Sequence, residues 1–289
     1  MTEIQLSAGT IDYEDTGGSG PTIVLLHGLL MDASLWDEAI ADLSVDHRCV
    51  APTLPLGAHR SPVNPGADLT PDGIASLVAE FLERLDLREV TLIGNDTGGV
   101  IVQILAARCA SASTDPGVDR IGRIVLASCD AFDNYPPGLT GKAVVAAGKL
   151  PPPLFGVFMQ QMRLRPIRRL PIAFRWLTKR GDAATARWMK PVLRSAGVRR
   201  DTVAVLRAIA ANLNLLVDLS DDLAKFDRPA LVVWAKGDRV MRSDYGRRLA
   251  ALLPDARLVE IDDSYTLIPL DQPKRLAGAI RSFVAQPND

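Results

Sequence analysis

The chain has 289 residues, which is enough for one large domain or for a domain that carries an insertion. A formal net charge of -1 gives the chain no electrostatic attraction to nucleic acid, so a nucleic-acid partner is excluded. The three cysteines (Cys49, Cys109 and Cys129) have no CxxC spacing and predict neither a disulfide scaffold nor a zinc site. Residues 1–10 lack the basic-then-apolar build of a signal peptide, and no run approaches the roughly 18 apolar residues of a membrane span. We therefore expect a cytoplasmic protein with no membrane partner.

Short apolar segments alternate with longer helical patterns, which is typical of a parallel sheet covered by helices. The first two segments, TIVLL at 22–26 and RCVA at 48–51, have the continuous apolar pattern of strands buried on both faces. Thr70 and Pro71 then begin a helix whose apolar positions up to Leu85 follow the helical repeat. Four more buried strands are expected at residues 90–94, 124–128, 230–234 and 257–261.

Helices are expected to alternate with these later strands. A helix rich in small residues covers 99–110, and others begin near Ser243 and near Gln272. At the N-terminus, residues 4–6 and 10–13 would add an antiparallel edge. The pattern predicts an α/β fold with a mostly parallel, eight-stranded sheet flanked by helices.

The alternation is interrupted once, between residues 134 and 220. Residues 139–220 contain 15 Lys+Arg against 3 Asp+Glu, whereas the rest of the chain is acidic. A composition shift of this size marks an insertion, so we predict a core of residues 1–133 and 221–289 and an inserted helical cap of residues 134–220. Apolar residues of the cap are expected to line a substrate chamber below a basic outer surface, namely Phe155, Phe158, Met159, Met162, Phe174, Trp176, Trp188 and Met189.

The strongest chemical signal is the run GNDTGG at residues 94–99, between a predicted strand and a predicted helix. A Gly-x-nucleophile-x-Gly turn in this context strains the backbone at the nucleophile and requires small neighbours. Asp96 takes the nucleophile position, where most such turns have serine. The start of the following helix favours a negative charge there. The alternative is an aspartate that only caps an ordinary strand–helix turn.

This elbow resembles the nucleophile elbow of the α/β-hydrolase superfamily, and the resemblance extends over nearly the whole chain. His27-Gly28, directly after the first buried strand, is similar to the His-Gly pair of that superfamily. The resemblance implies an oxyanion hole formed by the backbone N–H groups of Leu29 and Thr97, with His27 bracing its loop.

Carboxylates follow two of the later strands, at the edge of the sheet where such active sites open. Asp238 comes just past the strand 230–234, and the resemblance implies that it is the acid of a catalytic triad; helix capping is the alternative. Asp130 and Asp133 follow the strand 124–128 and can point into the same mouth of the fold.

The histidine of such a triad belongs in a short segment after the last strand, in a pattern like Asp-Ser-x-His-Phe. Here residues 263–267 read DSYTL, and Asp-Gln-Pro at 271–273 fixes the register. Thr266 therefore stands in the place of the histidine. A threonine hydroxyl has no useful basicity near neutral pH, so Thr266 alone cannot replace the base.

The sequence contains three histidines. His59, in the loop after the strand 48–51, lies at the carboxyl edge of the sheet and is the candidate to replace the missing base; packing within its loop is the alternative. His47 precedes its strand and so belongs to the opposite edge. Residues that could support the pocket are His27, Asp130, Thr266 and Trp36.

An aspartate at the elbow makes the resemblance one to the Asp-nucleophile branch of the superfamily, the haloalkane dehalogenases and epoxide hydrolases. In this branch the aspartate attacks a saturated carbon, and water activated by the histidine hydrolyses the resulting ester. Dehalogenases resemble one another in a tryptophan after the nucleophile and often an asparagine after His-Gly, where this chain has Thr97 and Leu29. Epoxide hydrolases carry a His-Gly-x-Pro run and cap tyrosines, where this chain has Leu30 and, at the edge of the cap, Tyr135.

These observations favour a hydrolase without cofactor or metal, in which Asp96 attacks a small to medium apolar substrate at a carbon–halogen, epoxide or ester bond. Two alternatives stay open. Asp96 could be the base of a cofactor-free lyase, isomerase or cyclase, or the chain could be a ligand-binding homologue that has lost turnover. The expected partner is a small molecule, and a monomer and a homodimer are both compatible with the sequence.

Overall fold

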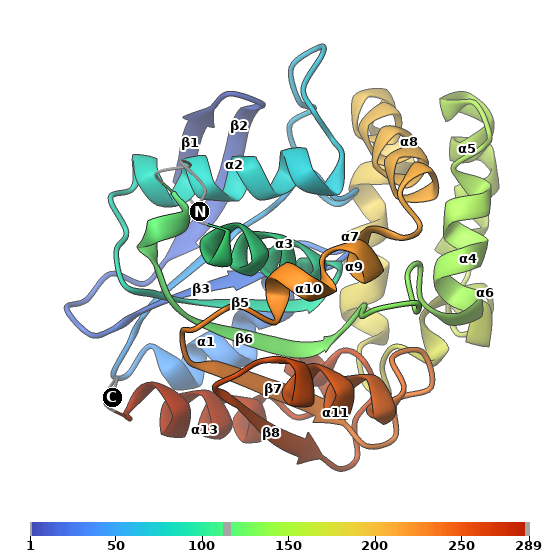
Figure 1. Ribbon diagram of the computed structural model, residues 1–289. Helices are drawn as coiled ribbons and strands as arrows, with labels where there is room; N and C mark the ends of the chain where they lie inside the picture. The colour runs from blue at the N-terminus through green and yellow to red at the C-terminus, as the bar shows by residue number, and fades with distance from the viewer. Residues whose placement is uncertain (1, 112–116, 287–289) are drawn as a thin grey trace.

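The computed structural model describes residues 2–111 and 117–286. Eight strands form one sheet in the order β1-β2-β4-β3-β5-β6-β7-β8 (Figure 1). β2 pairs antiparallel with β1 and with β4, and the other neighbouring strands pair parallel. The predicted α/β fold with a mostly parallel, eight-stranded sheet is confirmed. The strands are β1 (Thr2–Leu6), β2 (Gly9–Asp15), β3 (Thr22–Leu26), β4 (Arg48–Pro52), β5 (Val90–Asp96), β6 (Ile121–Cys129), β7 (Ala230–Ala235) and β8 (Ala256–Ile261).

Helices flank the sheet, with α1 packed on α13 and α2 packed on α3. Within residues 2–111 and 117–286, no helix is long and apolar enough to cross a membrane. The helices are η1 (Ala33–Trp36), α1 (Asp37–Leu43), α2 (Pro71–Arg84), α3 (Thr97–Ala110), η2 (Val118–Arg120), α4 (Gly138–Ala147), α5 (Pro152–Met159), η3 (Gln160–Arg163), α6 (Arg165–Arg168), η4 (Pro171–Arg175), α7 (Asp182–Arg194), α8 (Ala196–Ala211), α9 (Leu215–Asp218), α10 (Ser220–Leu223), α11 (Ser243–Leu252), α12 (Ile268–Asp271) and α13 (Pro273–Val284).

The central strand β5 runs two residues further than its apolar pattern predicts. Its pairing with β6 continues past an irregularity after Asn95, so that Asp96 lies opposite Cys129. The helix α3 then begins at Thr97 rather than at residue 99, because the Asp96 side chain accepts a hydrogen bond from the Thr97 N–H and caps the helix. Asp96 is therefore the last residue of the central strand and the cap of the helix that follows it.

The helix α3 lies so close to the end of β3 that Gly98 has no room for a side chain. A Cβ on Gly98 would lie 2.8 Å from the His27 carbonyl oxygen and closer still to that of Leu26. This contact holds the start of α3 against the turn that follows β3. The elbow and the residues after His27 are thus brought together by backbone packing.

The helices α4–α9 form what we call the cap segment, residues 134–220, which connects β6 to α10. In Figure 1 its helices stand together on one side of the sheet, with α8 packed on α4, α5 and α7. The helical insertion is present, as predicted, whereas the division into domains with the stated boundaries stays a prediction. The helix α10 starts at the end of this segment and packs on α3, so the chain has returned to the sheet layer there.

Two buried carboxylates tie the cap segment to the rest of the protein. Asp201 in α8 is 1% exposed, accepts a hydrogen bond from the Val63 N–H (3.0 Å) and lies 3.3 Å from the His59 Nε2. Asp271 in α12 is 4% exposed and accepts a hydrogen bond from the Thr178 hydroxyl at 2.8 Å. The backbone N–H groups of the next two residues donate to the same carboxylate, at 3.0 and 3.1 Å. We call these contacts the Asp201 latch and the Asp271 latch.

A backbone hydrogen bond extends the Asp271 latch. The Leu267 N–H donates to the Leu177 carbonyl oxygen at 2.8 Å. Leu267 directly follows Thr266, the residue that stands in the predicted histidine position. The cap segment is therefore fastened to the same loop that carries Thr266.

Candidate active site

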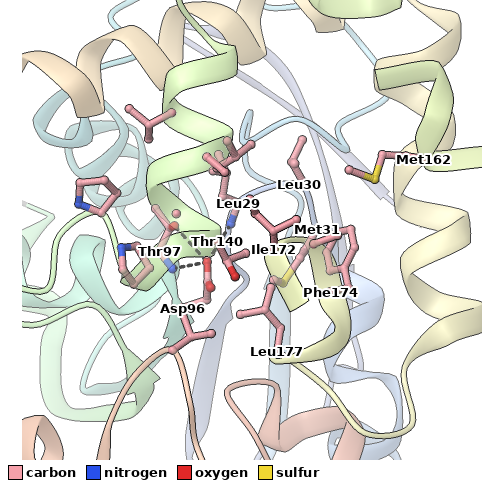
Figure 2. A pocket seen from close by; sticks show the side chains of 18 of the residues that line it. Leu29, Leu30, Met31, Asp96, Thr97, Thr140, Met162, Ile172, Phe174 and Leu177 are labelled. Carbon is pink, nitrogen blue, oxygen red and sulfur yellow. Dashed lines mark hydrogen bonds between the residues drawn. The ribbon is translucent and has the colours of Figure 1, made fainter. Parts of the chain in front are cut away.

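Asp96 has an uncommon backbone conformation for an aspartate. Its φ of 55° and ψ of -131° lie outside the regions that L-residues favour, as expected of a nucleophile elbow. The side chain is buried, with 6% of its surface exposed. The residue lines a cavity between the sheet edge and the cap segment (Figure 2).

One oxygen of the Asp96 carboxylate takes up the hydrogen bonds of the turn. Asp96 Oδ1 accepts from the Thr97 N–H (2.7 Å), the Thr97 hydroxyl (3.0 Å) and the Leu29 N–H (3.2 Å). Dashed lines mark hydrogen bonds between these residues in Figure 2. These are the two amides that the sequence predicts as an oxyanion hole. Among the described residues, none donates a hydrogen bond to Asp96 Oδ2. The predicted hole is thus occupied by Asp96 Oδ1, whereas Oδ2 has no donor among the described residues.

The Leu29 amide can approach Asp96 only because residue 28 is a glycine. A Cβ on Gly28 would lie 2.5 Å from the Asp96 Cβ and 2.7 Å from its Cγ, well inside van der Waals contact. Burial raises the pKa of Asp96 above its usual value, while the hydrogen bonds from Thr97 and Leu29 act in the opposite direction. The start of α3 was expected to favour the charged form, and burial outweighs that preference.

Asp238 and Thr266 are hydrogen-bonded to each other. Asp238 Oδ1 accepts from the Thr266 hydroxyl (2.9 Å) and from the N–H groups of Val240 (2.9 Å) and Met241 (2.8 Å). Asp238 Oδ2 is buried and has no hydrogen-bond partner among the described residues. Burial raises the pKa of Asp238 to about 7. The side chain in the predicted histidine position thus contacts the predicted triad acid, but it is a hydroxyl and not an imidazole.

Asn95, directly before Asp96, positions this loop. Its Nδ2 donates to the Thr266 carbonyl oxygen (2.8 Å) and to the Ala127 carbonyl oxygen (2.7 Å). The side chain is fully buried. Sequence reasoning did not single out Asn95, although a buried amide inside the elbow motif is a signal that could have done so.

The cavity beside Asp96 has a volume of about 180 Å³. Cavities of about 150 Å³ with apolar walls hold molecules the size of benzene. The walls here come mostly from apolar side chains, and Phe158, Leu170 and Ile172 are also exposed at the surface, so they form an apolar mouth. Of the cap residues predicted to line a chamber, four do so: Phe158, Met159, Met162 and Phe174. The other four do not line it, namely Phe155, Trp176, Trp188 and Met189.

Two side chains of this cavity each have a buried polar atom without a hydrogen-bond partner among the described residues. Asp130 (1% exposed) and Tyr135 (5% exposed) follow β6, and the Asp130 Oδ1 and the Tyr135 hydroxyl are unpartnered among the described residues. Burial and the charge of Asp96 raise the pKa of Asp130 well above the ordinary aspartate value. Burial and Asp130 raise the pKa of Tyr135. Among residues 2–111 and 117–286, no group of three or more His, Cys, Asp or Glu side chains could hold a metal ion.

Comparison with known proteins identifies the family of this chain. Residues 23–279 match the model of the alpha/beta hydrolase family. The chain belongs to this family. This α/β hydrolase is 28% identical to haloalkane dehalogenase 2 of Mycobacterium tuberculosis over 278 residues, which cover 95% of this chain and 91% of the relative. It is 26% identical to a 2-hydroxy-6-oxononadienedioate/2-hydroxy-6-oxononatrienedioate hydrolase of Cupriavidus pinatubonensis, over 86% of this chain and 81% of the relative.

The fold is also similar to that of a solved structure. A thermophilic esterase from Thermogutta terrifontis superposes with a TM-score of 0.73 at 21% identity, covering 98% of this chain and 97% of the esterase. The sequence relatives of this α/β hydrolase thus include proteins named for dehalogenation and for hydrolysis of a dioate, and an esterase has a similar fold. The reaction of this chain has to be argued from its own site.

The histidines of this α/β hydrolase lie apart from Asp96. His27 is fully buried, with its Nδ1 2.9 Å from the Gly28 carbonyl oxygen and its Nε2 accepting from the Leu54 N–H at 2.8 Å. Burial lowers the pKa of His27 to about 4, so the imidazole is neutral and joins two loops. His47, just before β4, bonds to Asp46 at 2.8 Å.

His59 was the candidate to replace the missing base, and the structure places it elsewhere. Its Nδ1 accepts from the Gly57 N–H at 3.3 Å, and its Nε2 contacts Asp201 in the Asp201 latch. Both ring nitrogens are therefore engaged, and the ring is not among the described side chains that line the cavity. The reason is that α8 of the cap segment brings a buried carboxylate to the loop of His59.

Two further candidates also lie outside the cavity. Trp36 is fully buried at the end of η1 and packs in the core. Asp133 has an exposed carboxylate that pairs with Arg248 at 3.2 Å. The described residues that line the cavity with polar side chains near the elbow are Asp96, Thr97, Asp130, Tyr135 and Thr140.

Proposed function

We propose that this α/β hydrolase uses Asp96 Oδ2 to attack a saturated, electrophilic carbon, as in a haloalkane or an epoxide, and forms an ester with the substrate. The observation that carries this proposal is the occupation of the oxyanion hole by Asp96 Oδ1. A relative named haloalkane dehalogenase 2 supports the same chemistry.

Acyl transfer and alkyl transfer differ in which oxygen the oxyanion hole has to bind. In an acyl transfer the developing negative charge is on the carbonyl oxygen of the substrate, and the hole must be open to receive it. In an alkyl transfer the hole instead holds the spectator oxygen of the carboxylate and aims the other oxygen at the substrate. Here Leu29 and Thr97 already hold Oδ1. Of the carbon–halogen, epoxide and ester bonds considered, attack on an ester carbonyl is therefore the least suitable reaction.

The oxyanion hole has a second role once the ester has formed. Asp96 Oδ1 is then the carbonyl oxygen of the ester, and it is already hydrogen-bonded to Leu29 and Thr97. Water that attacks Asp96 Cγ drives negative charge onto this oxygen, which is where the two amides point. The hole is therefore suited to both steps, because it aims Oδ2 during formation of the ester and stabilises the charge on Oδ1 during hydrolysis.

The same contact makes the lyase or isomerase alternative less suitable. An enolate would need the Leu29 and Thr97 amides, and the Asp96 carboxylate occupies them. A pure ligand-binding role would not require a strained, buried carboxylate with one oxygen free. The apolar cavity of about 180 Å³ fits a small to medium apolar substrate in either case.

The proposal is tested by intact-mass spectrometry of the protein after incubation with bromobutane. We expect the mass of one butyl group to be added, and peptide mapping to locate it at Asp96. Asp96→Asn should take up no alkyl group, whereas Asp133→Asn, whose carboxylate is exposed outside the cavity, should react like the wild type. No adduct and no bromide release from the wild type would rule the proposal out.

A further inference from the structure

The cavity contains two polar groups that the proposed nucleophile does not use. The Asp130 Oδ1 and the Tyr135 hydroxyl are buried and have no hydrogen-bond partner among the described residues, although both side chains line the cavity of Asp96. An unmade hydrogen bond at a buried group is unfavourable, because the group has lost its contact with water without gaining a partner. Two such groups in a mostly apolar cavity indicate that the natural ligand brings a polar atom of its own.

The charge state of these groups decides which atom that is. Burial and the negative charge of Asp96 raise the pKa of Asp130 well above its usual value, and both effects favour the protonated form of the carboxyl. Tyr135, whose pKa is also raised, keeps its hydroxyl proton. Both groups can then donate a hydrogen bond, and the matching ligand atom is an acceptor oxygen.

We propose that Asp130 donates a proton to the oxygen of an epoxide as Asp96 opens the ring, and afterwards accepts a proton from the water that hydrolyses the ester. This inference rests on the proposed function and narrows its substrate class to epoxides. It also assigns to Asp130 the role of general base, which the histidine would have at the position of Thr266.

The ring-opening step consumes the proton of Asp130. An electron pair of Asp96 Oδ2 forms a bond to one epoxide carbon, and the bond between that carbon and the ring oxygen breaks. The ring oxygen keeps the electron pair of the broken bond and takes the Asp130 proton, while the Tyr135 hydroxyl donates a hydrogen bond to it. The products are a hydroxyalkyl ester on Asp96 and a carboxylate on Asp130.

The hydrolysis step returns that proton. Water adds to Asp96 Cγ, and one of its protons goes to the Asp130 carboxylate, which is a competent base because the cavity raises its pKa. The negative charge that develops on Asp96 Oδ1 is stabilised by the Leu29 and Thr97 amides. When the intermediate collapses, the ester C–O bond breaks and the departing oxygen takes the second water proton. A diol leaves, Asp96 is again a carboxylate and Asp130 again an acid.

A haloalkane would not complete this cycle. Halide leaves with its electron pair and needs no proton, so Asp130 stays protonated after alkylation and cannot act as a base. The alkyl ester on Asp96 should then accumulate. The two electrophiles therefore differ in outcome even though the same oxygen attacks both.

The inference is tested with epoxyhexane and bromobutane on the wild type and on Asp130→Asn. Asparagine has the size of the protonated acid but can neither release nor take up the proton. We expect the wild type to convert epoxyhexane to the diol over many turnovers and to stop after one alkylation by bromobutane. Asp130→Asn should lose about 100-fold or more in diol formation, the usual scale of general acid–base catalysis. Its alkylation by bromobutane should stay within about threefold of the wild type, which also shows that it folds.

Further variants separate the outcomes. Tyr135→Phe should lower diol formation by about tenfold, the value of one hydrogen bond of about 1.4 kcal/mol in the transition state. Asp133→Asn, the exposed carboxylate of the same loop, should have no effect. Unchanged diol formation in Asp130→Asn, or repeated turnover of bromobutane by the wild type, would overturn the inference and leave the proposed function standing. Failure of both electrophiles to react at Asp96 would remove the proposed function itself.

Discussion

The Asp238 carboxyl allows a prediction about stability that does not depend on any substrate. Asp238 is 7% exposed, and its burial raises its pKa from 3.8 to about 7. A difference of about three pKa units, at about 1.4 kcal/mol for each, corresponds to about 4 kcal/mol. Replacing Asp238 by asparagine removes the titration but keeps an oxygen that can accept from Thr266, Val240 and Met241.

Whether stability rises or falls with pH depends on whether the folded or the unfolded chain holds the Asp238 proton. Below about pH 4 the carboxyl is protonated in both the folded and the unfolded chain, so burial of a charge costs nothing. Between about pH 4 and pH 7 the unfolded chain releases the proton while the folded chain retains it, and the free energy of unfolding therefore falls as the pH rises. Asp96 and Asp130 contribute in the same direction, but they are present in both proteins and cancel in the difference.

The measurement is urea unfolding of the wild type and Asp238→Asn across this pH range, followed by tryptophan fluorescence. Relative to Asp238→Asn, the wild type should lose about 4 kcal/mol of unfolding free energy between about pH 4 and about pH 8. Asp255→Asn, which changes an exposed carboxylate, is the matched control and should follow the wild type. A difference between wild type and Asp238→Asn that stays constant with pH, within about 1 kcal/mol, would refute the reasoning.

Two further substitutions test the geometry around the elbow. Gly28→Ala should lower the rate of Asp96 alkylation by bromobutane at least about tenfold, because the added Cβ overlaps the carboxylate. Gly278→Ala is the control and should leave that rate unchanged, because Gly278 has open space around it. Equal alkylation rates for both variants would contradict the close approach of Gly28 to Asp96. His59→Gln should leave diol formation within about threefold of the wild type but lower the free energy of unfolding by about 1–3 kcal/mol, since buried Asp201 loses a partner. Loss of diol formation in a fully stable His59→Gln would instead make His59 the base.

The sequence predicts the fold well because the features that set it are local. A run such as TIVLL at 22–26 has the pattern of a buried strand wherever it occurs, and the elbow motif fixes where strand passes into helix. The partner of His59 could not be predicted in this way. Asp201 is 142 positions away, and only the packing of α8 on the core loop brings the two side chains together.

The candidate site was predictable by residue type but not by arrangement. Asp96, Leu29 and Thr97 follow from motif positions, yet the filling of the hole by Oδ1 depends on the backbone angles of Asp96 and on the lack of a side chain at Gly28. Asp130 was recognisable as a carboxylate at the right edge of the sheet. Its lack of a partner, by contrast, depends on the whole cavity wall, which no local pattern encodes.

The Asp271 latch has a consequence for protein engineering. Leu177 forms part of the cavity wall and is hydrogen-bonded through its carbonyl oxygen to the residue after Thr266. A cap segment grafted from a relative in order to change the substrate range would therefore lack these hydrogen bonds, unless the loop of residues 263–271 were exchanged with it. In this protein the unit of recombination is the cap segment together with that loop, and chimeras joined only at the ends of the insertion would separate a wall of the cavity from its anchor.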